Sequence, residues 1–140
     1  MISKNESDTR MLGQECGKKC QAGEVIALNG PLGAGKTLFV RGLAEGLGIP
    51  PSAPVNSPTF ILIQEYLGGR LPLYHIDFYR IEKNQEIATL GLEDYFFGKG
   101  VTVVEWGEKF PAAFPAHAQW WKFEITGETE RKIKKMEKPC

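Results

Sequence analysis

The residues best suited to chemistry form one short, glycine-rich run. Residues 30–37 read Gly-Pro-Leu-Gly-Ala-Gly-Lys-Thr and match the pattern G-x-x-x-x-G-K-[ST] at every fixed position. Glycines let the backbone turn so that its N–H groups reach phosphate oxygens. Lys36 supplies a mobile positive charge for the β- and γ-phosphates, and the Thr37 hydroxyl suits a Mg²⁺ ligand. The run therefore predicts a site for a nucleoside triphosphate and Mg²⁺.

Two acids are candidates for the other half of such a site. A phosphate-binding loop of this kind works with a carboxylate at a strand end, which holds the metal's water shell or positions an attacking water. Glu105 directly follows the apolar run 101–104, and Asp77 ends the run 71–77. Ligands of α/β sheets bind outside the carboxyl ends of the strands. We expect both acids at the metal and in catalysis, with Glu105 the stronger candidate for the catalytic acid.

The elements that carry these residues predict an α/β fold. The run 24–29 is short, nearly all apolar and bounded by glycine, which is typical of a strand covered on both faces. The segment 36–47 has apolar residues at helical spacing. A strand, a glycine-rich turn and a helix in this order indicate a doubly covered sheet. We expect a single domain over 1–140, with a three-layer P-loop NTPase fold and a mixed, partly parallel sheet.

The remaining segments predict further strands and helices around that centre. A helix is expected over 9–20, with Ser7 and Asp8 at its N-cap, and the segment 52–58 is typical of a loop because it is rich in proline and serine. The other expected elements are strands over 60–66, 71–77 and 101–104, short helices over 82–88 and 92–97, and a C-terminal hairpin made of 120–125 and 131–136. The hairpins add antiparallel edges to the sheet.

Composition limits the class of partner. Of the 140 residues, 17 are Lys or Arg and 17 are Asp or Glu, so the formal net charge is zero. A protein that binds nucleic acid through many phosphate contacts normally has a basic surplus, so the balance excludes a self-sufficient, strongly cationic nucleic-acid binder. No run reaches 18 apolar residues and the N-terminus lacks the apolar core of a signal peptide. We expect a cytoplasmic protein that has no membrane partner and keeps its three cysteines as thiols.

Several classes of P-loop protein leave signatures that this sequence lacks. It contains neither the N-K-x-D tetrapeptide that binds guanine nor the L-S-G-G-Q signature of transporter ATPases. The 140 residues leave little room for the lid of a small-molecule kinase. ATP is therefore the expected nucleotide, and hydrolysis is favoured over transfer to a small acceptor. A stand-alone small-molecule kinase and a nucleotide-gated binding module without chemistry remain as alternatives.

Motifs beyond the glycine-rich run resemble the TsaE family, also called YjeE. In chain order they read S-P-T-F at 57–60, H-I-D-F-Y-R at 75–80, L-G-L at 90–92 and V-E-W at 104–106. Members of this family are small P-loop ATPases of bacterial tRNA threonylcarbamoyladenosine synthesis. Several motifs in one order are far more specific than the P-loop alone, which very many proteins share.

The resemblance implies roles for single residues. Thr37, Asp77 and Glu105 would hold Mg²⁺, and Lys36 would act in catalysis with the two acids. Trp106 would pack near the nucleotide or a partner, or serve as a core aromatic. The expected nucleotide-binding residues are Gly33, Ala34, Gly35, Lys36, Thr37, Leu38 and Thr59, the last on a switch-like loop that senses the γ-phosphate.

The resemblance also implies partners. ATPases of this type act with the TsaD and TsaB proteins, which transfer a threonylcarbamoyl group to an adenosine of tRNA. On this expectation the chain meets tRNA only through the complex, hydrolysis resets the complex between turnovers, and the isolated protein hydrolyses ATP weakly. The basic run 128–140 either contacts tRNA or an acidic partner, or protects a sheet edge against aggregation, and the second interpretation is favoured.

Overall fold

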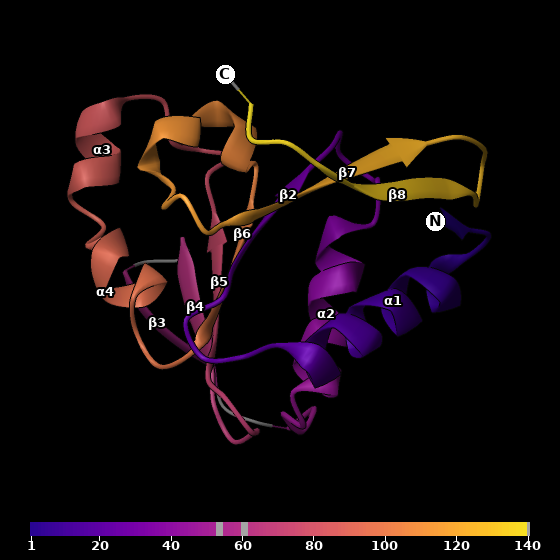
Figure 1. Cartoon of the computed structure of the whole chain (residues 1–140), viewed down its shortest axis with the longest axis horizontal. Coiled ribbons are helices and arrows are strands. Elements are labelled where there is room, and N and C mark those ends of the chain that lie inside the picture. The colour runs from indigo at the N-terminus through magenta and orange to yellow at the C-terminus, as the bar shows by residue number, and fades with distance from the viewer. Residues whose placement is uncertain (53–54, 60–61, 140) are drawn as a thin grey trace.

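An eight-stranded sheet forms the centre of the structure. The computed structural model describes residues 1–52, 55–59 and 62–139, with 55–59 described by their backbone alone. Across the sheet the strands follow the order β1-β8-β7-β2-β6-β5-β4-β3 (Figure 1). The strands are β1 (Ile2–Ser3), β2 (Val25–Asn29), β3 (Val55–Thr59), β4 (Ile63–Tyr66), β5 (Leu73–Asp77), β6 (Val101–Glu105), β7 (Gln119–Ile125) and β8 (Arg131–Met136).

The middle of the sheet is parallel and its margins are antiparallel. β2 pairs in parallel with β6 and β7, and β6 also pairs in parallel with β5. The pairs β3–β4, β4–β5, β7–β8 and β1–β8 are antiparallel. Every residue of β2 and β6 is buried, because both faces of these strands are covered. The predicted α/β fold with a mixed, partly parallel sheet and antiparallel hairpins is confirmed.

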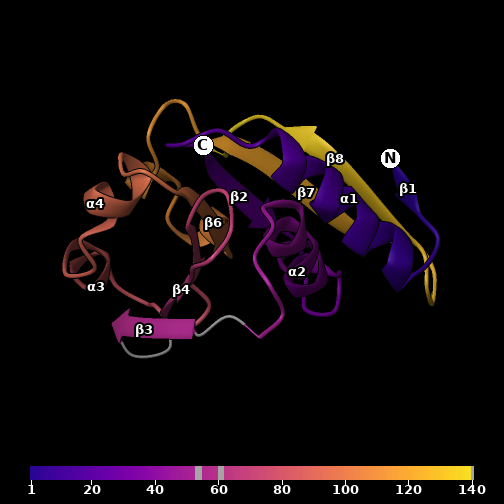
Figure 2. The same ribbon diagram turned by 90° about the horizontal axis from the view of Figure 1, so that it is seen from below.

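Helices cover both faces of the sheet, which gives three layers (Figures 1 and 2). α1 and α2 lie side by side on one face, and the shorter helices and turns lie on the other. Phe39, Leu43 and Phe123 belong to the apolar core of the first face, and Phe78 and Phe114 to that of the second. The helices are α1 (Glu6–Lys19), α2 (Lys36–Gly46), α3 (Asn84–Ala88) and α4 (Leu92–Phe96), with 3-10 turns η1 (Gly107–Lys109) and η2 (Pro111–Ala113).

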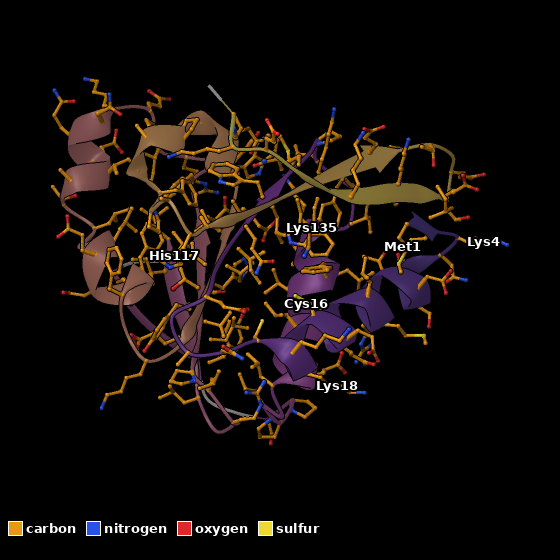
Figure 3. All side chains as sticks on the ribbon, in the orientation of Figure 1. Met1, Lys4, Cys16, Lys18, His117 and Lys135 are labelled. Atoms are coloured by element: carbon orange, nitrogen blue, oxygen red, sulfur yellow. The ribbon has the colours of Figure 1, made fainter. Side chains whose placement is uncertain are left out.

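Side chains fill the space between the sheet and its helices on both faces (Figure 3). On the α1 side, the half-buried Cys16 and the buried Cys20 are free thiols, as expected for the two cysteines that the structure describes. Lys135 of β8 lies on the same side of the sheet, with its ammonium 5.5 Å from the centre of the Trp121 ring. This face is therefore a packed apolar core with a cationic side chain at its rim.

Four glycines let α1 and α2 pack backbone against backbone. Gly13 and Gly17 of α1 face Gly42 and Gly46 of α2, and a Cβ added at any of them would lie under 3.0 Å from a backbone oxygen of the other helix. Arg10 of α1 also donates to both carboxylate oxygens of Glu45 on α2. This contact ties the N-terminal part of α1 to the last turn of α2.

The N-terminal helix begins earlier than the sequence predicts. α1 starts at Glu6 rather than at residue 9, and its N-cap is Asn5 rather than Ser7 and Asp8. The Asn5 Oδ1 accepts a hydrogen bond of 2.9 Å from the backbone N–H of Asp8, so an earlier residue provides the cap. The first turn of α1 therefore lies closer to the chain terminus than expected.

The predicted loop over 52–58 is wrong in its second half. Val55–Thr59 forms β3, which pairs antiparallel with β4 and has a register irregularity between Asn56 and Thr59. A strand forms here because β4 offers unpaired backbone groups to an extended chain, and proline is tolerated on an edge strand. Within the strand expected over 60–66, the structure describes β4 at Ile63–Tyr66. Residues 53–54 and 60–61 of these two predictions lie outside the described residues.

Other predicted elements are present with small shifts at their ends. The short helices and the C-terminal hairpin are confirmed as α3, α4 and β7–β8. The two-residue β1 was not predicted, and it pairs only with Arg131 and Lys132 at the start of β8. Within the described ranges, no helix has the length and apolar character needed to cross a membrane.

Candidate functional site

The glycine-rich run forms a tight loop between β2 and α2, and this loop is called the P-loop below (residues 30–37). β2 ends at Asn29 and α2 begins at Lys36. Gly33 and Gly35 have φ angles of 80° and 97°, which side chains rarely adopt, so glycine is required at both positions. Gly35 is also the N-cap of α2 and brings no side chain to it. The first N–H groups of α2 are thus left for another acceptor, as in anion sites at helix N-termini.

A cavity of about 710 Å³ opens in front of the P-loop. It is called the P-loop cavity below, and five separate stretches of the chain line it. The lining comprises residues 32–38, the N-terminal Asn5, Glu6, Ser7 and Thr9, the strand-end residues Asp77, Tyr79, Glu105 and Trp106, and Glu128, Thr129 and Arg131 of the β7–β8 hairpin. The structure therefore brings together all the expected site residues except Thr59, which ends β3 and whose side chain lies outside the described residues.

The P-loop lysine is buried and points back at its own loop. Lys36 is 4% exposed, and its Nζ donates a hydrogen bond of 2.6 Å to the Gly30 carbonyl oxygen. The same Nζ lies 3.6 Å from the centre of the Trp106 ring, a cation–π contact. Burial lowers the pKa of Lys36, and the neighbouring carboxylates offset only part of that effect. An anion in the cavity would give this ammonium a stronger partner than a carbonyl.

Glu105 is the acid in direct contact with the P-loop. It is 6% exposed, and its carboxylate oxygens accept the Thr37 hydroxyl at 3.1 and 3.2 Å. One oxygen also lies 2.5 Å from His75 Nε2. Burial by itself raises the pKa of the Glu105 carboxyl, but the hydrogen bonds from His75 and Thr37 and the charge of Lys36 outweigh it, so the pKa lies below its usual value. The carboxylate is thus ionised at neutral pH.

Asp77 lies beside Glu105 but is bound differently. The two acids end adjacent parallel strands and are paired in register. Asp77 Oδ1 accepts a hydrogen bond of 2.8 Å from the backbone N–H of Tyr79. Among the described residues, no hydrogen bond joins Asp77 to Thr37, whose hydroxyl donates to Glu105. Glu105 and Thr37 are therefore placed for a metal's first contacts, with Asp77 at the next position along the sheet edge.

The donor set suits Mg²⁺ shared with phosphates rather than a closed metal cage. In the described part of the chain, no group of three or more His, Cys, Asp or Glu side chains is arranged to hold a metal alone. Mg²⁺ usually takes one or two protein oxygens and completes its shell with water and substrate phosphates. The hydroxyl of Thr37 and the carboxylate of Glu105 fit that pattern.

Several residues at the site were not predicted from the sequence. His75 lies two residues before Asp77 on β5, and this spacing places both side chains on one face of the strand. The spacing is the sequence signal that could have indicated His75 as a site residue. The Tyr79 and Trp106 rings pack at a tilt of 47°, with their centres 5.1 Å apart. Trp106, which the sequence left open, lines the P-loop cavity and has φ of 63°, the only positive φ of a non-glycine residue in the described ranges.

Arg131 reaches the loop from the far end of the chain. Its Nη2 and Nε donate to the Gly33 carbonyl oxygen at 3.1 and 3.3 Å. The β7–β8 hairpin thereby forms one wall of the P-loop cavity. The resemblance implies Arg131 only as a weak candidate for contact with the nucleobase, and its hydrogen bonds to Gly33 span most of the chain.

An α/β sheet whose central parallel strand leads through a G-x-x-x-x-G-K-[ST] loop into a helix is the architecture of P-loop proteins. Within that class, the model of the family "Threonylcarbamoyl adenosine biosynthesis protein TsaE" matches residues 3–135. The chain belongs to the TsaE family.

Similar proteins agree with this assignment. The chain is 43% identical to the tRNA threonylcarbamoyladenosine biosynthesis protein TsaE of Bacillus subtilis (strain 168), over 92% of this chain and 79% of that one. It is 38% identical to the TsaE of Treponema pallidum (strain Nichols), over 94% and 96% of the two chains. A crystal structure of Bacillus subtilis YdiB superposes with a TM-score of 0.79 at 37% identity, covering 95% of this chain and 80% of YdiB.

Proposed function

We propose that this protein is the ATP-binding and ATP-hydrolysing component of tRNA N6-threonylcarbamoyladenosine biosynthesis. The observation that carries the proposal is the P-loop cavity itself, where the loop, Lys36, Thr37 and a buried, ionised Glu105 meet. Membership of the TsaE family supports the pathway. The proposal includes action in the cytoplasm, together with TsaD and TsaB.

The cavity offers a separate contact for each part of ATP. The N–H groups of 33–38 at the start of α2 suit the phosphates, and Lys36 would exchange the Gly30 carbonyl for the β- and γ-phosphates. The first turn of α1 and the hairpin residues Glu128, Thr129 and Arg131 also line the cavity, and they are proposed to contact the nucleoside. When bound, Mg²⁺ would neutralise charge that develops on the phosphates.

Glu105 is the residue proposed to orient the attacking water. An ionised carboxylate accepts a hydrogen bond from water, and the lowered pKa keeps Glu105 in that form at neutral pH. Thr37 would turn its oxygen to the metal, while His75 keeps Glu105 in place at 2.5 Å. In the ligand-free protein Thr37 and His75 both engage this carboxylate, which supports weak hydrolysis by the isolated protein.

The reaction on tRNA is proposed to belong to the partners. The formal net charge of zero gives the chain no basic surplus for holding tRNA alone. The P-loop cavity, of about 710 Å³, is proposed to hold one nucleotide, and a smaller cavity of about 360 Å³ also borders Thr37. TsaD and TsaB would therefore bind tRNA, and this chain would meet it only through them.

The decisive experiment measures ATP hydrolysis by the purified protein with and without TsaD, TsaB and substrate tRNA. We expect weak hydrolysis alone and a clear increase with the partners. Lys36→Ala is expected to lose ATP binding, because it removes the only cation on the P-loop. Glu105→Ala is expected to bind ATP and to lose roughly 10²-fold or more in turnover. Unchanged hydrolysis by Glu105→Ala would exclude Glu105 as the catalytic acid.

The same experiment separates the two alternatives. Phosphate transfer to a metabolite by the protein alone would indicate a stand-alone small-molecule kinase. Partner affinity that differs between ATP and ADP, with no hydrolysis stimulated by partners, would indicate a nucleotide-gated binding module. ATP consumption that depends on TsaD and TsaB excludes both.

A further inference from the structure

A second cavity, of about 500 Å³, lies behind the start of the P-loop. It is called the rear cavity below. Asn29 and Gly30 line it at the end of β2, Glu108 lines it from η1, and residues of β7 and β8 complete its walls. Trp106 lines both this cavity and the P-loop cavity, so its side chain separates the two. Apart from Gly30 and Trp106, the proposed function uses no residue that lines the rear cavity.

Two buried oxygen atoms at the rear cavity have no hydrogen-bond donor among the described residues. Asn29 is 5% exposed, and its Nδ2 lies 3.3 Å from the Met136 sulfur while its Oδ1 has no partner. Glu108 Oε2 accepts the Gly30 N–H at 3.2 Å, but its Oε1 is buried and also has no partner. Buried acceptors are nearly always satisfied in folded proteins. Both atoms are therefore unsatisfied acceptors, which a hydrogen-bond donor at this wall would satisfy.

The charge and the walls of the rear cavity define that ligand further. Its charged side chains are Glu108, Glu124 and Lys122, and the Lys122 ammonium lies 3.5 Å from Glu124. The carboxylate of Glu108 has no ion-pair partner within 4 Å among the described residues, although its charge acts to raise the pKa of the nearby Lys36. The remaining walls are largely apolar, with Pro31 and Phe123 among them. A positive group with several N–H donors on an apolar stem matches these surroundings, which describes an arginine side chain.

We propose that the rear cavity binds the guanidinium group of an arginine side chain presented by a partner protein, with Glu108 as its principal contact. Guanidinium carries five N–H donors and no acceptor, so one group satisfies acceptors on two residues. The apolar walls take the methylene stem. Asn29 Oδ1 supplies the second hydrogen bond and limits how deeply the group enters.

A guanidinium at this position acts on the P-loop through two hydrogen bonds. Glu108 accepts from the N–H of Gly30, and the carbonyl oxygen of Gly30 accepts from Lys36. A cation that attracts the Glu108 carboxylate competes with the Gly30 N–H for it. The position of Gly30 then changes, and with it the hydrogen bond from Lys36 to the Gly30 carbonyl oxygen. Trp106, beneath the Lys36 ammonium, directly precedes the η1 turn that carries Glu108. The rear cavity thus lets a partner influence the nucleotide site without entering it.

The test uses N-acetyl-L-arginine amide as the probe and the ¹H–¹⁵N NMR spectrum of the full chain as the readout. We expect saturable shifts of the Gly30 N–H and of the Asn29 side-chain amide. The neutral isostere N-acetyl-L-citrulline amide is expected to bind roughly tenfold more weakly, because a charged donor strengthens the hydrogen bonds. Glu108→Gln is expected to weaken the arginine probe by a similar factor. The matched control, Glu128→Gln in the P-loop cavity, is expected to bind it as the wild type does.

Three results would overturn the proposal: no saturable shift at tens of millimolar probe, equal binding of the two probes, or unchanged binding by Glu108→Gln. Glu108→Ala gives the same comparison if the first variant does not fold, since the spectrum reports folding directly. Free L-arginine identifies the source of the group. If the blocked probe binds at least as tightly as free arginine, the result supports an arginine side chain within a polypeptide. If only free arginine binds, the result contradicts that source. None of these measurements depends on ATP hydrolysis.

Discussion

The carboxylate of Glu105 receives hydrogen bonds from residues of two different elements. Thr37 stands at the start of α2, His75 on β5, and Glu105 itself at the end of β6. A carboxyl buried at this depth without those partners would have a raised pKa and would be protonated more easily. The hydrogen bonds reverse this, so one side chain is both buried and charged. That combination is what a base that orients water requires.

The lowered pKa of Glu105 makes the stability of the fold depend on pH. Its stabilising effect is complete above the ordinary value of 4.5 and is lost as the pH falls through the lower folded-state pKa. We expect Glu105→Gln to lower the free energy of unfolding by about 1 kcal/mol at pH 7, and this difference to disappear toward pH 3. Urea unfolding without Mg²⁺ measures it.

Glu128→Gln is the control for this titration, since Glu128 lines the same cavity from an exposed turn. Its unfolding free energy is expected to follow that of the wild type at every pH. A difference between Glu105→Gln and the wild type that grows as the solution is acidified would show that the sign of the pKa change is wrong.

At the scale of elements, the α1–α2 pair decides where the first turn of α1 lies. Glycines on both helices bring the backbones together, and the Arg10–Glu45 contact ties the helices near that turn. Asn5, Glu6, Ser7 and Thr9 then form one wall of the P-loop cavity. The position of this wall therefore depends on the contact between α1 and α2.

Gly42→Ala tests that contact, because its expected effect on the free energy of unfolding has the opposite sign to that of the same substitution in an exposed helix. In an exposed helix, replacing glycine by alanine stabilises by about 0.5–1 kcal/mol. Here the added Cβ would collide with the backbone oxygen of Arg10, so we expect a loss of about 3 kcal/mol. Thermal and urea unfolding measure the change, with Glu15→Ala on the exposed side of α1 as the control. A stabilised Gly42→Ala would contradict backbone packing at this position.

At the scale of the whole molecule, the P-loop cavity is assembled from both ends of the chain. Its walls come from the N-terminal turn of α1, the P-loop, the ends of β5 and β6, and the β7–β8 hairpin. A ligand that fills the cavity must therefore restrict the motion of segments that lie far apart in the sequence. A ligand held by the loop alone would leave the two ends unchanged.

Hydrogen exchange distinguishes these cases. With ATP and Mg²⁺ we expect slower exchange at 5–9 and 126–131 as well as at 30–38, because the nucleoside is proposed to lie between the first two. Residues 84–96, which form α3 and α4 on the opposite face, are the internal control and should not change. Protection confined to 30–38 would place the nucleoside outside the cavity.

The sequence by itself determined the features that depend on local chemistry. Glycine at positions that need positive φ, Lys36 and Thr37 at the start of a helix, and acids at the ends of apolar strands follow from residue type and spacing. The buried parallel strands follow from their continuous apolar runs. Capping of α1 and the pairing of β3 were not determined in this way, because a different cap and a free strand edge competed with local preference.

Only the tertiary structure decided which distant residues meet. His75 and Glu105 are 30 positions apart, and Arg131 and Gly33 are 98 apart, so their contacts depend on strand order and register rather than on any local pattern. The glycine contact between α1 and α2 and the rear cavity behind Gly30 arise in the same way. The physical reason is that residue type fixes what a group is able to do, while the packing of the sheet and its helices fixes what stands within hydrogen-bond distance of it.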